Sequence, residues 1–217
     1  MTMQISDTVL FDNEEYILYD VENKSLFASV NALGLCPKTI SSACWRGNIL
    51  SFSVTDKILL SKIIVRTVDG KYPAINNVVA QKLDDHFGAY VYNNVNLPFQ
   101  YNGRMIIVQG KYDFYDDTLP LYFRRSRYVR TQYYSKVSEL CFSDGILTGV
   151  NDLSEKNDKL KELIRKNFPL QTGRPSEKER LSDDILITAF GEQEWWMHPE
   201  LTADLKQAPS DFGRIIK

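Results

Sequence analysis

The sequence predicts an α+β fold, with antiparallel β-hairpin sheets and helices near residues 74–87 and 152–168. Two observations favour the sheets. Short apolar runs alternate with turn-forming residues along much of the chain, which is typical of hairpins. Tyrosine and phenylalanine are also abundant, with 12 and 11 copies, and such rings favour the half-buried surface of a sheet. A third observation favours the helices, because both segments place apolar residues at helical spacing.

The clearest strand signals lie in two neighbouring segments. Leu50, Phe52 and Val54 alternate with polar residues, so one apolar face would lie beneath a strand. Thr55-Asp56-Lys57 then supplies a turn, and a β-branched run follows from Ile58 to Val68. We interpret this pattern as two strands joined by a tight turn.

The two predicted helices have different signals at their ends. The segment 74–87 has Pro73 near its start, a position that proline favours in helices. The segment 152–168 begins with Asp152-Leu153-Ser154-Glu155, which has the form of a capping box, and Pro169 would stop it. An apolar stripe along this second segment predicts that one helix face is buried.

A similar order of features returns about 90 residues later in the chain. Residues 11–18 resemble residues 101–108, and residues 52–59 resemble residues 140–147. Few residues are identical between the matched segments, so two explanations of the similarity remain open. One is an internal duplication, and the other is chance matching of common hairpin patterns.

The sequence predicts one α+β domain over residues 1–170. A duplication would relate about residues 8–88 to residues 98–168 as two β lobes, because a repeat array needs at least three units to bury a continuous core. A polar stretch broken by glycine and proline begins at Gln171. Residues 171–217 are therefore expected to form a C-terminal extension packed on the core.

Composition and charge limit the class of protein. The formal net charge is −2 and the isoelectric point is about 5.8, so the whole chain has no general attraction for nucleic acid or an anionic membrane. No secretory signal and no apolar membrane-spanning segment is present, which predicts a cytoplasmic location and no membrane partner. Cys36, Cys44 and Cys141 are odd in number and lack paired spacing, so reduced thiols are expected.

No motif for a common cofactor or metal site is present. Gly70-Lys71 and Gly110-Lys111 lack the glycine that a phosphate-binding loop requires five residues earlier. The dinucleotide, α/β-hydrolase and zincin motifs are also absent. Asp84-Asp85-His86 is a poor metal site, because consecutive residues on a helix point in different directions. We therefore expect no metal site and no cofactor.

One acidic group keeps an enzyme in consideration. Asp113, Asp116 and Asp117 have the residue types of a cation site or a carboxylate pair, and Arg124 could hold an anion beside them. The alternative interpretation is a polar turn, since Asp-Asp-Thr followed by Leu-Pro has strong turn character. The sequence leaves open whether the protein is an enzyme, and its features favour a protein without catalytic activity.

Two segments are candidate binding sites. Trp45 and Arg46 combine a large ring with a fixed cation, although the alternative is a ring packed at a strand entry with the arginine stacked on a neighbour. The second segment, residues 122–134, has four arginines and no acid among five aromatic residues. If it is extended, Arg124, Tyr128 and Arg130 share one face. The alternative is an edge strand whose arginines pair with the protein's own acids.

These observations favour a non-catalytic intracellular protein that binds another protein, as an immunity-type or adaptor protein does. An enzyme with dispersed carboxylates, either a hydrolase or a transferase, is the alternative. A third option is local nucleic-acid binding through the strip of arginines and tyrosines. A pocket that gathers titratable groups would indicate an enzyme, whereas an exposed face would indicate a binding protein.

Overall fold

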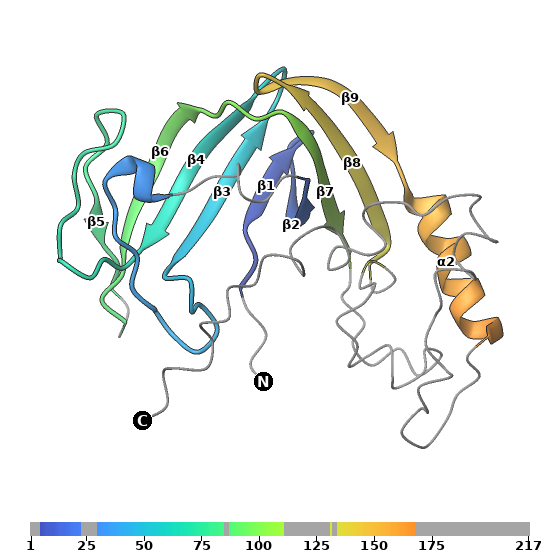
Figure 1. The fold of residues 1–217 in the computed structure, drawn as a ribbon, viewed down its shortest axis with the longest axis horizontal. Helices are drawn as coiled ribbons and strands as arrows, with labels where there is room; N and C mark the ends of the chain where they lie inside the picture. Colours follow the sequence, from blue (N-terminus) through green and yellow to red (C-terminus); the bar gives the residue numbers. More distant parts are fainter. Residues whose placement is uncertain (1–4, 23–29, 85–86, 111–130, 132–133, 168–217) are drawn as a thin grey trace, which may run out of the picture. The chain divides into compact units, whose positions relative to one another are not determined.

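A large mixed sheet of nine strands makes up most of the described structure (Figure 1). The computed structural model describes residues 5–22, 30–84, 87–110, 131 and 134–167. The chain divides into two compact units: unit 1 is Met1–Gln109 with Lys136–Leu153, and unit 2 is Gly110–Ser135 with Ser154–Lys217. Unit 1 contains the sheet, and the described part of unit 2 contains an α-helix. This largely β composition is compatible with the expected α+β class.

The strands are β1 (Thr8–Phe11), β2 (Glu14–Val21), β3 (Asn48–Val54), β4 (Ile58–Val65), β5 (Gln81–Lys82), β6 (Tyr90–Pro98), β7 (Gly103–Gln109), β8 (Lys136–Ser143) and β9 (Ile146–Asp152). Their order across the sheet is β5-β6-β4-β3-β1-β2-β7-β8-β9. β1 is parallel to β3, and the other neighbouring strands are antiparallel.

The expected antiparallel sheets are therefore one continuous sheet with a parallel pair. The parallel pair exists because the chain crosses back after β2 and enters β3 alongside β1, in the same direction. A short 3₁₀ helix, η2 (Val30–Leu33), lies in this crossover. A crossover joins residues distant in sequence, and hairpin patterns alone do not predict it.

Two of the hairpins have two-residue turns with left-handed backbone. Asp12 and Asn13 join β1 to β2 with φ angles of 51° and 61°, and Asp144 and Gly145 join β8 to β9 with φ angles of 50° and 77°. A turn with two positive φ angles matches the twist of the flanking strands, and Asp, Asn and Gly tolerate this backbone best. These turns follow directly from the local sequence.

The predicted helix near 74–87 is wrong. Asn76 and Asn77 have φ angles of 48° and 64°, which no right-handed helix accepts. Ile75 and Val78 exchange backbone hydrogen bonds of 3.0 and 2.9 Å across them, and β5 follows. The Asn76 side chain also donates to the Val95 carbonyl of β6 at 2.7 Å. The local turn and this contact with β6 overcome the helical spacing of the apolar residues.

The predicted helix near 152–168 is confirmed as α2 (Ser154–Asn167). Within unit 2, the Asn157 side chain donates to the Thr131 and Tyr134 carbonyls, each at 3.1 Å. Leu160 is fully buried, as the apolar stripe predicts. The expected C-terminal extension, residues 171–217, lies outside the described residues.

The sheet of unit 1 is strongly curved. β6 and β7 are five positions apart in the strand order, yet the four residues 99–102 join them. In a flat sheet these strands would lie about 24 Å apart, whereas the link spans at most about 18 Å. The curve brings the β3–β4 turn against the β8–β9 turn, where the Leu147 amide donates to the Asp56 carbonyl at 2.9 Å.

The main core lies inside this curve. The Phe52 ring of β3 is 5.7 Å from the Phe99 ring, and the Tyr101 ring is 5.9 Å from the Phe142 ring of β8. Phe99 and Tyr101 stack at 6.4 Å between them. This row of rings connects strands that are four positions apart in the sheet.

Four apolar residues of the segments compared in the suggested duplication are buried. Phe52 and Val54 are 0% and 3% exposed, and Leu140 and Phe142 are 0% and 5% exposed. The four side chains belong to one hydrophobic core. In a duplication of two β lobes each pair would face the core of its own lobe; the residues are buried as such a role requires, but in a shared core, and the duplication itself stays a prediction.

Candidate functional site

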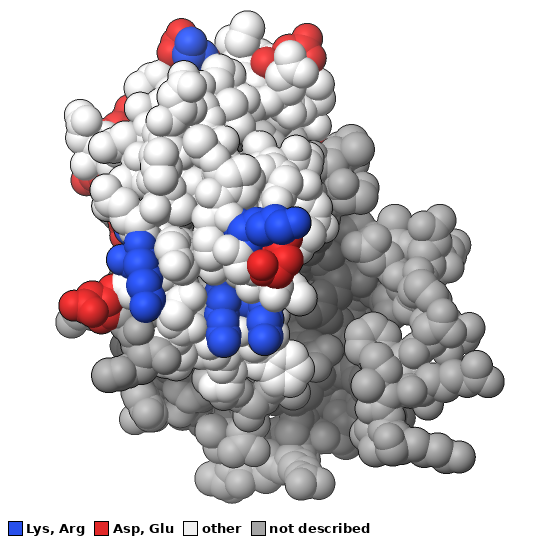
Figure 2. Space-filling model, turned by 90° about the vertical axis from the view of Figure 1, so that its left-hand side faces the viewer, with Lys and Arg blue, Asp and Glu red and all other residues white. Residues whose placement is uncertain are grey.

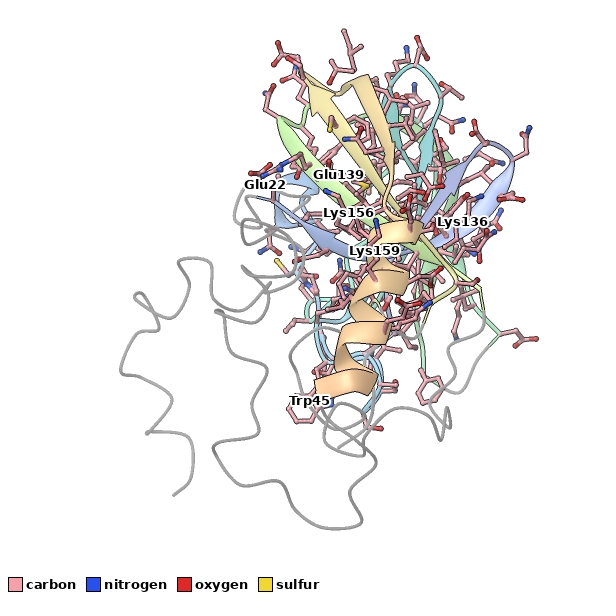
Figure 3. The ribbon with its side chains drawn as sticks, turned by 90° about the vertical axis from the view of Figure 1, so that its right-hand side faces the viewer. Glu22, Trp45, Lys136, Glu139, Lys156 and Lys159 are labelled. Carbon is pink, nitrogen blue, oxygen red and sulfur yellow. The ribbon has the colours of Figure 1, made fainter. Side chains whose placement is uncertain are left out.

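The loop that leads into β3 presents a tryptophan to solvent. Trp45 is 70% exposed, an unusual position for the largest aromatic side chain, which is mostly buried in folded proteins. We call Pro37–Gly47 together with Arg66 the Trp45 corner. The corner lies at the end of the sheet where β3 begins, and Figure 3 shows Trp45 well apart from Glu22 and Glu139.

The backbone of the Trp45 corner is held by its own hydrogen bonds. The Cys44 amide donates to the Ser41 carbonyl at 2.9 Å, and the Ile40 amide donates to the Cys44 carbonyl at 3.1 Å. Gly47 has a φ angle of +76°, and a Cβ there would lie 2.5 Å from the Lys38 carbonyl oxygen. Only glycine fits this position, and Cys44 is buried. The backbone of the loop is therefore ordered, and it holds Trp45 on the solvent-exposed side of the loop.

Arg46 ties the corner to the N-terminal segment. Its Nε donates to the Asn48 carbonyl at 2.7 Å, and its Nη2 donates to the Ile5 carbonyl at 3.0 Å. Nη2 also contacts Oδ1 of Asp7 at 2.6 Å, and the same oxygen accepts the Leu50 amide at 2.7 Å. The predicted binding residue Arg46 thus has a positioning role, since three intramolecular acceptors occupy its guanidinium.

Two further cations belong to the corner. The Lys38 amide donates to the Arg66 carbonyl at 2.6 Å, and the Arg66 amide donates to the Gly47 carbonyl at 3.1 Å. Nη1 of Arg66 lies 3.5 Å from the Thr39 carbonyl, and the Thr39 hydroxyl donates to the Trp45 carbonyl at 3.1 Å. The sequence reasoning missed both cations, because pairing of two distant segments places them beside Trp45.

Basic side chains are unevenly distributed on the side of the protein that carries β5 and β6. Figure 2 shows that most Lys and Arg residues visible there gather in the lower half of the described surface, while broad areas above are uncharged. The Trp45 corner lies toward this lower end, where β3 begins (Figure 1). The other predicted site residues, Arg124, Tyr128 and Arg130, lie outside the described residues, as do Asp113, Asp116 and Asp117.

A second cluster of charged groups joins β2, β7 and β8. Nε and Nη2 of Arg104 donate to the two carboxylate oxygens of Glu22, each at 3.0 Å, and the Arg104 amide donates to Oε2 of Glu22 at 3.1 Å. The hydrogen bonds from Arg104 hold the pKa of Glu22 below its ordinary value, and those to Glu22 raise the pKa of Arg104. Glu22 and Glu139 lie close together in Figure 3.

Glu139 is the most buried carboxylate of this cluster. Its Oε1 lies 3.7 Å from Nη1 of Arg104, and its Oε2 accepts the Asn151 amide at 2.9 Å. The Cys141 thiol is 3.9 Å from Oε2, and burial followed by the Glu139 charge raises the pKa of this thiol. A thiol held in its protonated form is a poor nucleophile. The hydrogen bonds and ion pairs of the cluster therefore link the residue after β2 to β7, β8 and β9.

We expect Glu22→Gln to make stability less dependent on pH. Because the folded-state pKa of Glu22 lies below its ordinary 4.5, its contribution is present above pH 4.5 and is lost as pH falls through the folded-state pKa. The variant should lose about 0.5–1 kcal/mol at pH 7, since the pair is partly exposed and screened. Urea unfolding between pH 7 and pH 3 measures this difference.

The difference in stability between wild type and Glu22→Gln should shrink as the pH falls through the folded-state pKa of Glu22, because protonated Glu22 resembles glutamine. Glu15→Gln, which removes the charge of an exposed carboxylate, is the control for a general effect of net charge. A difference that stays constant from pH 7 to pH 3 would contradict the role given to the Glu22–Arg104 pair.

Comparison with known proteins finds no matching family model, no matching curated protein and no matching solved structure. Within the described ranges, no group of three or more His, Cys, Asp or Glu residues could hold a metal ion. No helix in the described part of the chain is long and apolar enough to cross a bilayer.

Proposed function

We propose that this chain is a non-catalytic binding protein that recognises another protein through the Trp45 corner. The observation that carries the proposal is a tryptophan that is 70% exposed on a loop with a fixed backbone. Tryptophan is enriched among the few residues that dominate the energy of protein interfaces. A loop that is already ordered also loses less entropy when it binds, which favours affinity.

The neighbouring surface supports a contact larger than one side chain. Ile5 is 45% exposed and its carbonyl accepts a hydrogen bond from Arg46. Val68 is 67% exposed, and its amide donates to the Cys36 carbonyl at 2.8 Å, next to the Pro37–Thr67 bridge. Exposed apolar side chains on segments that are hydrogen-bonded to the Trp45 corner suit an interface with an apolar centre and a polar rim.

The proposed place of action is the cytoplasm. The three cysteines are unpaired, and Cys36 is exposed while Cys44 is buried. Exposed thiols persist in a reducing compartment, whereas extracellular proteins commonly pair them. The alternative of an enzyme that uses Asp113, Asp116 or Asp117 stays a prediction, because those residues lie outside the described ranges.

Truncation of the tryptophan tests the proposal. We expect Trp45→Ala to weaken the binding of at least one partner protein by about 30-fold or more, because loss of a central interface tryptophan commonly costs about 2 kcal/mol or more. Wild type and variant would be immobilised as full chains and exposed to lysate, and the captured proteins quantified by mass spectrometry. Circular dichroism and thermal unfolding would confirm that the variant is folded.

The matched control is Ile146→Ala. Ile146 is 57% exposed and bridges Lys57 at the β3–β4 turn, at the other end of β3 from Trp45. This variant should capture the same proteins as wild type. Identical lists of captured proteins for all three chains would reject the Trp45 corner as the binding site.

A further inference from the structure

The Trp45 corner is positively charged on a chain whose formal net charge is −2. It contains Lys38, Arg46 and Arg66 and no acidic residue. Among the described residues, the acid that forms an ion pair with it is Asp7, through Arg46. Three cations and one acid leave a net charge of +2 at this place. The charge around Trp45 is thus opposite in sign to the charge of the whole protein.

The single acid does not face outward. The Asp7 side chain is 13% exposed, whereas that of Arg46 is 42% exposed. Its Oδ1 atom accepts the Leu50 amide of β3 as well as Nη2 of Arg46. The negative charge of Asp7 is therefore directed into the protein, and the cations of the corner are closer to solvent.

Lys38 and Arg66 carry charge that the described residues do not neutralise. Lys38 is exposed and Arg66 is half-buried, and within the described ranges neither forms an ion pair. Backbone hydrogen bonds join Lys38 to Arg66 and Arg66 to Gly47, and the Thr39 hydroxyl donates to the Trp45 carbonyl. An apolar ring and two unneutralised cations are thus presented together on an ordered backbone.

We infer that the Trp45 corner binds an acidic peptide segment of its partner protein, in which Asp or Glu flanks an apolar side chain. This inference rests on the proposed function and adds the chemistry of the partner. The apolar side chain would pack on Trp45, and the carboxylates would lie within reach of Lys38 and Arg66. Complementary charge increases the rate of association and selects against basic partners.

The same residue types also occur in nucleic-acid sites, but the arrangement here suits a peptide better. Binding of a polyanion gains affinity from each phosphate that is neutralised, and two cations neutralise few. Proteins that bind single strands stack successive bases on several rings, whereas the described part of the corner presents Trp45 alone.

Selection from a random peptide library on the immobilised full chain tests the inference. Peptides that also bind Trp45→Ala would be removed by counter-selection. We expect the remaining peptides to be richer in Asp and Glu than the unselected library and to contain an apolar residue. Lys38→Glu and Arg66→Glu should each weaken binding of such a peptide about three- to tenfold, and added salt should weaken it further.

Lys57→Glu is the matched control, because Lys57 is an exposed cation in the β3–β4 turn, away from the corner. It should leave binding of the selected peptides unchanged. If no peptide depends on Trp45, both the proposed function and the inference fail. If Trp45-dependent peptides show no acidic enrichment, the inference alone fails. Tighter binding of a single-stranded DNA oligonucleotide than of any peptide, lost in Lys38→Glu, would overturn the choice of a protein partner.

Discussion

Replacement of Gly145 by alanine is expected to lower the free energy of unfolding by about 2–5 kcal/mol, because it combines a backbone penalty with a steric clash. Gly145 has a φ angle of +77°, which side chains with a Cβ adopt at a cost. A Cβ there would also lie 2.3 Å from the Phe99 carbonyl oxygen. Backbone atoms cannot move aside like the end of a flexible side chain.

The position of Gly145 makes this clash severe. Its amide donates to the Tyr101 carbonyl at 2.9 Å, and its carbonyl accepts the Ile58 amide at 2.8 Å. The Phe99 amide in turn donates to the Ile58 carbonyl at 3.2 Å. The turn therefore joins the β6–β7 link to the start of β4. Moving it away from Phe99 would lengthen the hydrogen bonds that keep the sheet curved.

Gly70→Ala separates the two contributions. Gly70 has a similar φ angle of +68°, but a Cβ there would meet no atom within 4 Å. It should therefore cost only the backbone penalty of about 1–2 kcal/mol. Urea unfolding of both variants measures the difference. Equal losses of stability would show that the close approach of Phe99 to Gly145 does not matter.

Local physical chemistry made part of this fold predictable. The turns at Asp12-Asn13 and Asp144-Gly145 need positive φ angles, and their residue types provide them. The helix α2 begins within the predicted capping box and ends before Pro169, so the residues at each end indicate where it starts and stops. In each case the deciding interactions lie within a few residues of one another.

The rest of the fold depends on contacts between distant segments. The apolar spacing in 74–87 fits a helix, yet Asn76 and Asn77 form a turn held against β6. Likewise, the parallel β1–β3 pair and the contact between the two turns require segments that hairpin patterns do not connect. A single sequence gives the period of apolar residues but not which strands become neighbours.

The candidate site likewise has a part that local sequence indicates and a part that depends on contacts between distant segments. Trp45 and Arg46 are adjacent in the sequence, and their residue types were enough to mark them as candidates without a structure. Arg66 comes to the corner through its backbone hydrogen bond with Gly47. Glu22 and Arg104 are 82 residues apart in the sequence. No local pattern marks these two contacts, and the spacing of their residues in the sequence resembles no known motif.

The row of rings inside the curved sheet leads to the second large effect. We expect Phe52→Ala and Phe142→Ala each to lower the free energy of unfolding by about 3–5 kcal/mol, as truncation of buried aromatic residues does. Both side chains are almost fully buried, and each packs on one of the two stacked rings of Phe99 and Tyr101. A truncated ring leaves a cavity that the curved sheet cannot easily close.

The same two variants test whether the sheet unfolds as one unit. If β3 and β8 share a core, both substitutions should shift a single urea transition of the sheet and leave its slope unchanged. Ile146→Ala, on an exposed side chain of β9, should shift it by less than about 0.5 kcal/mol. Two lobes that unfold independently would instead give two transitions, one sensitive to Phe52→Ala and the other to Phe142→Ala. That result would contradict the continuous core and would favour separate halves, because a cavity destabilises only the unit that contains it.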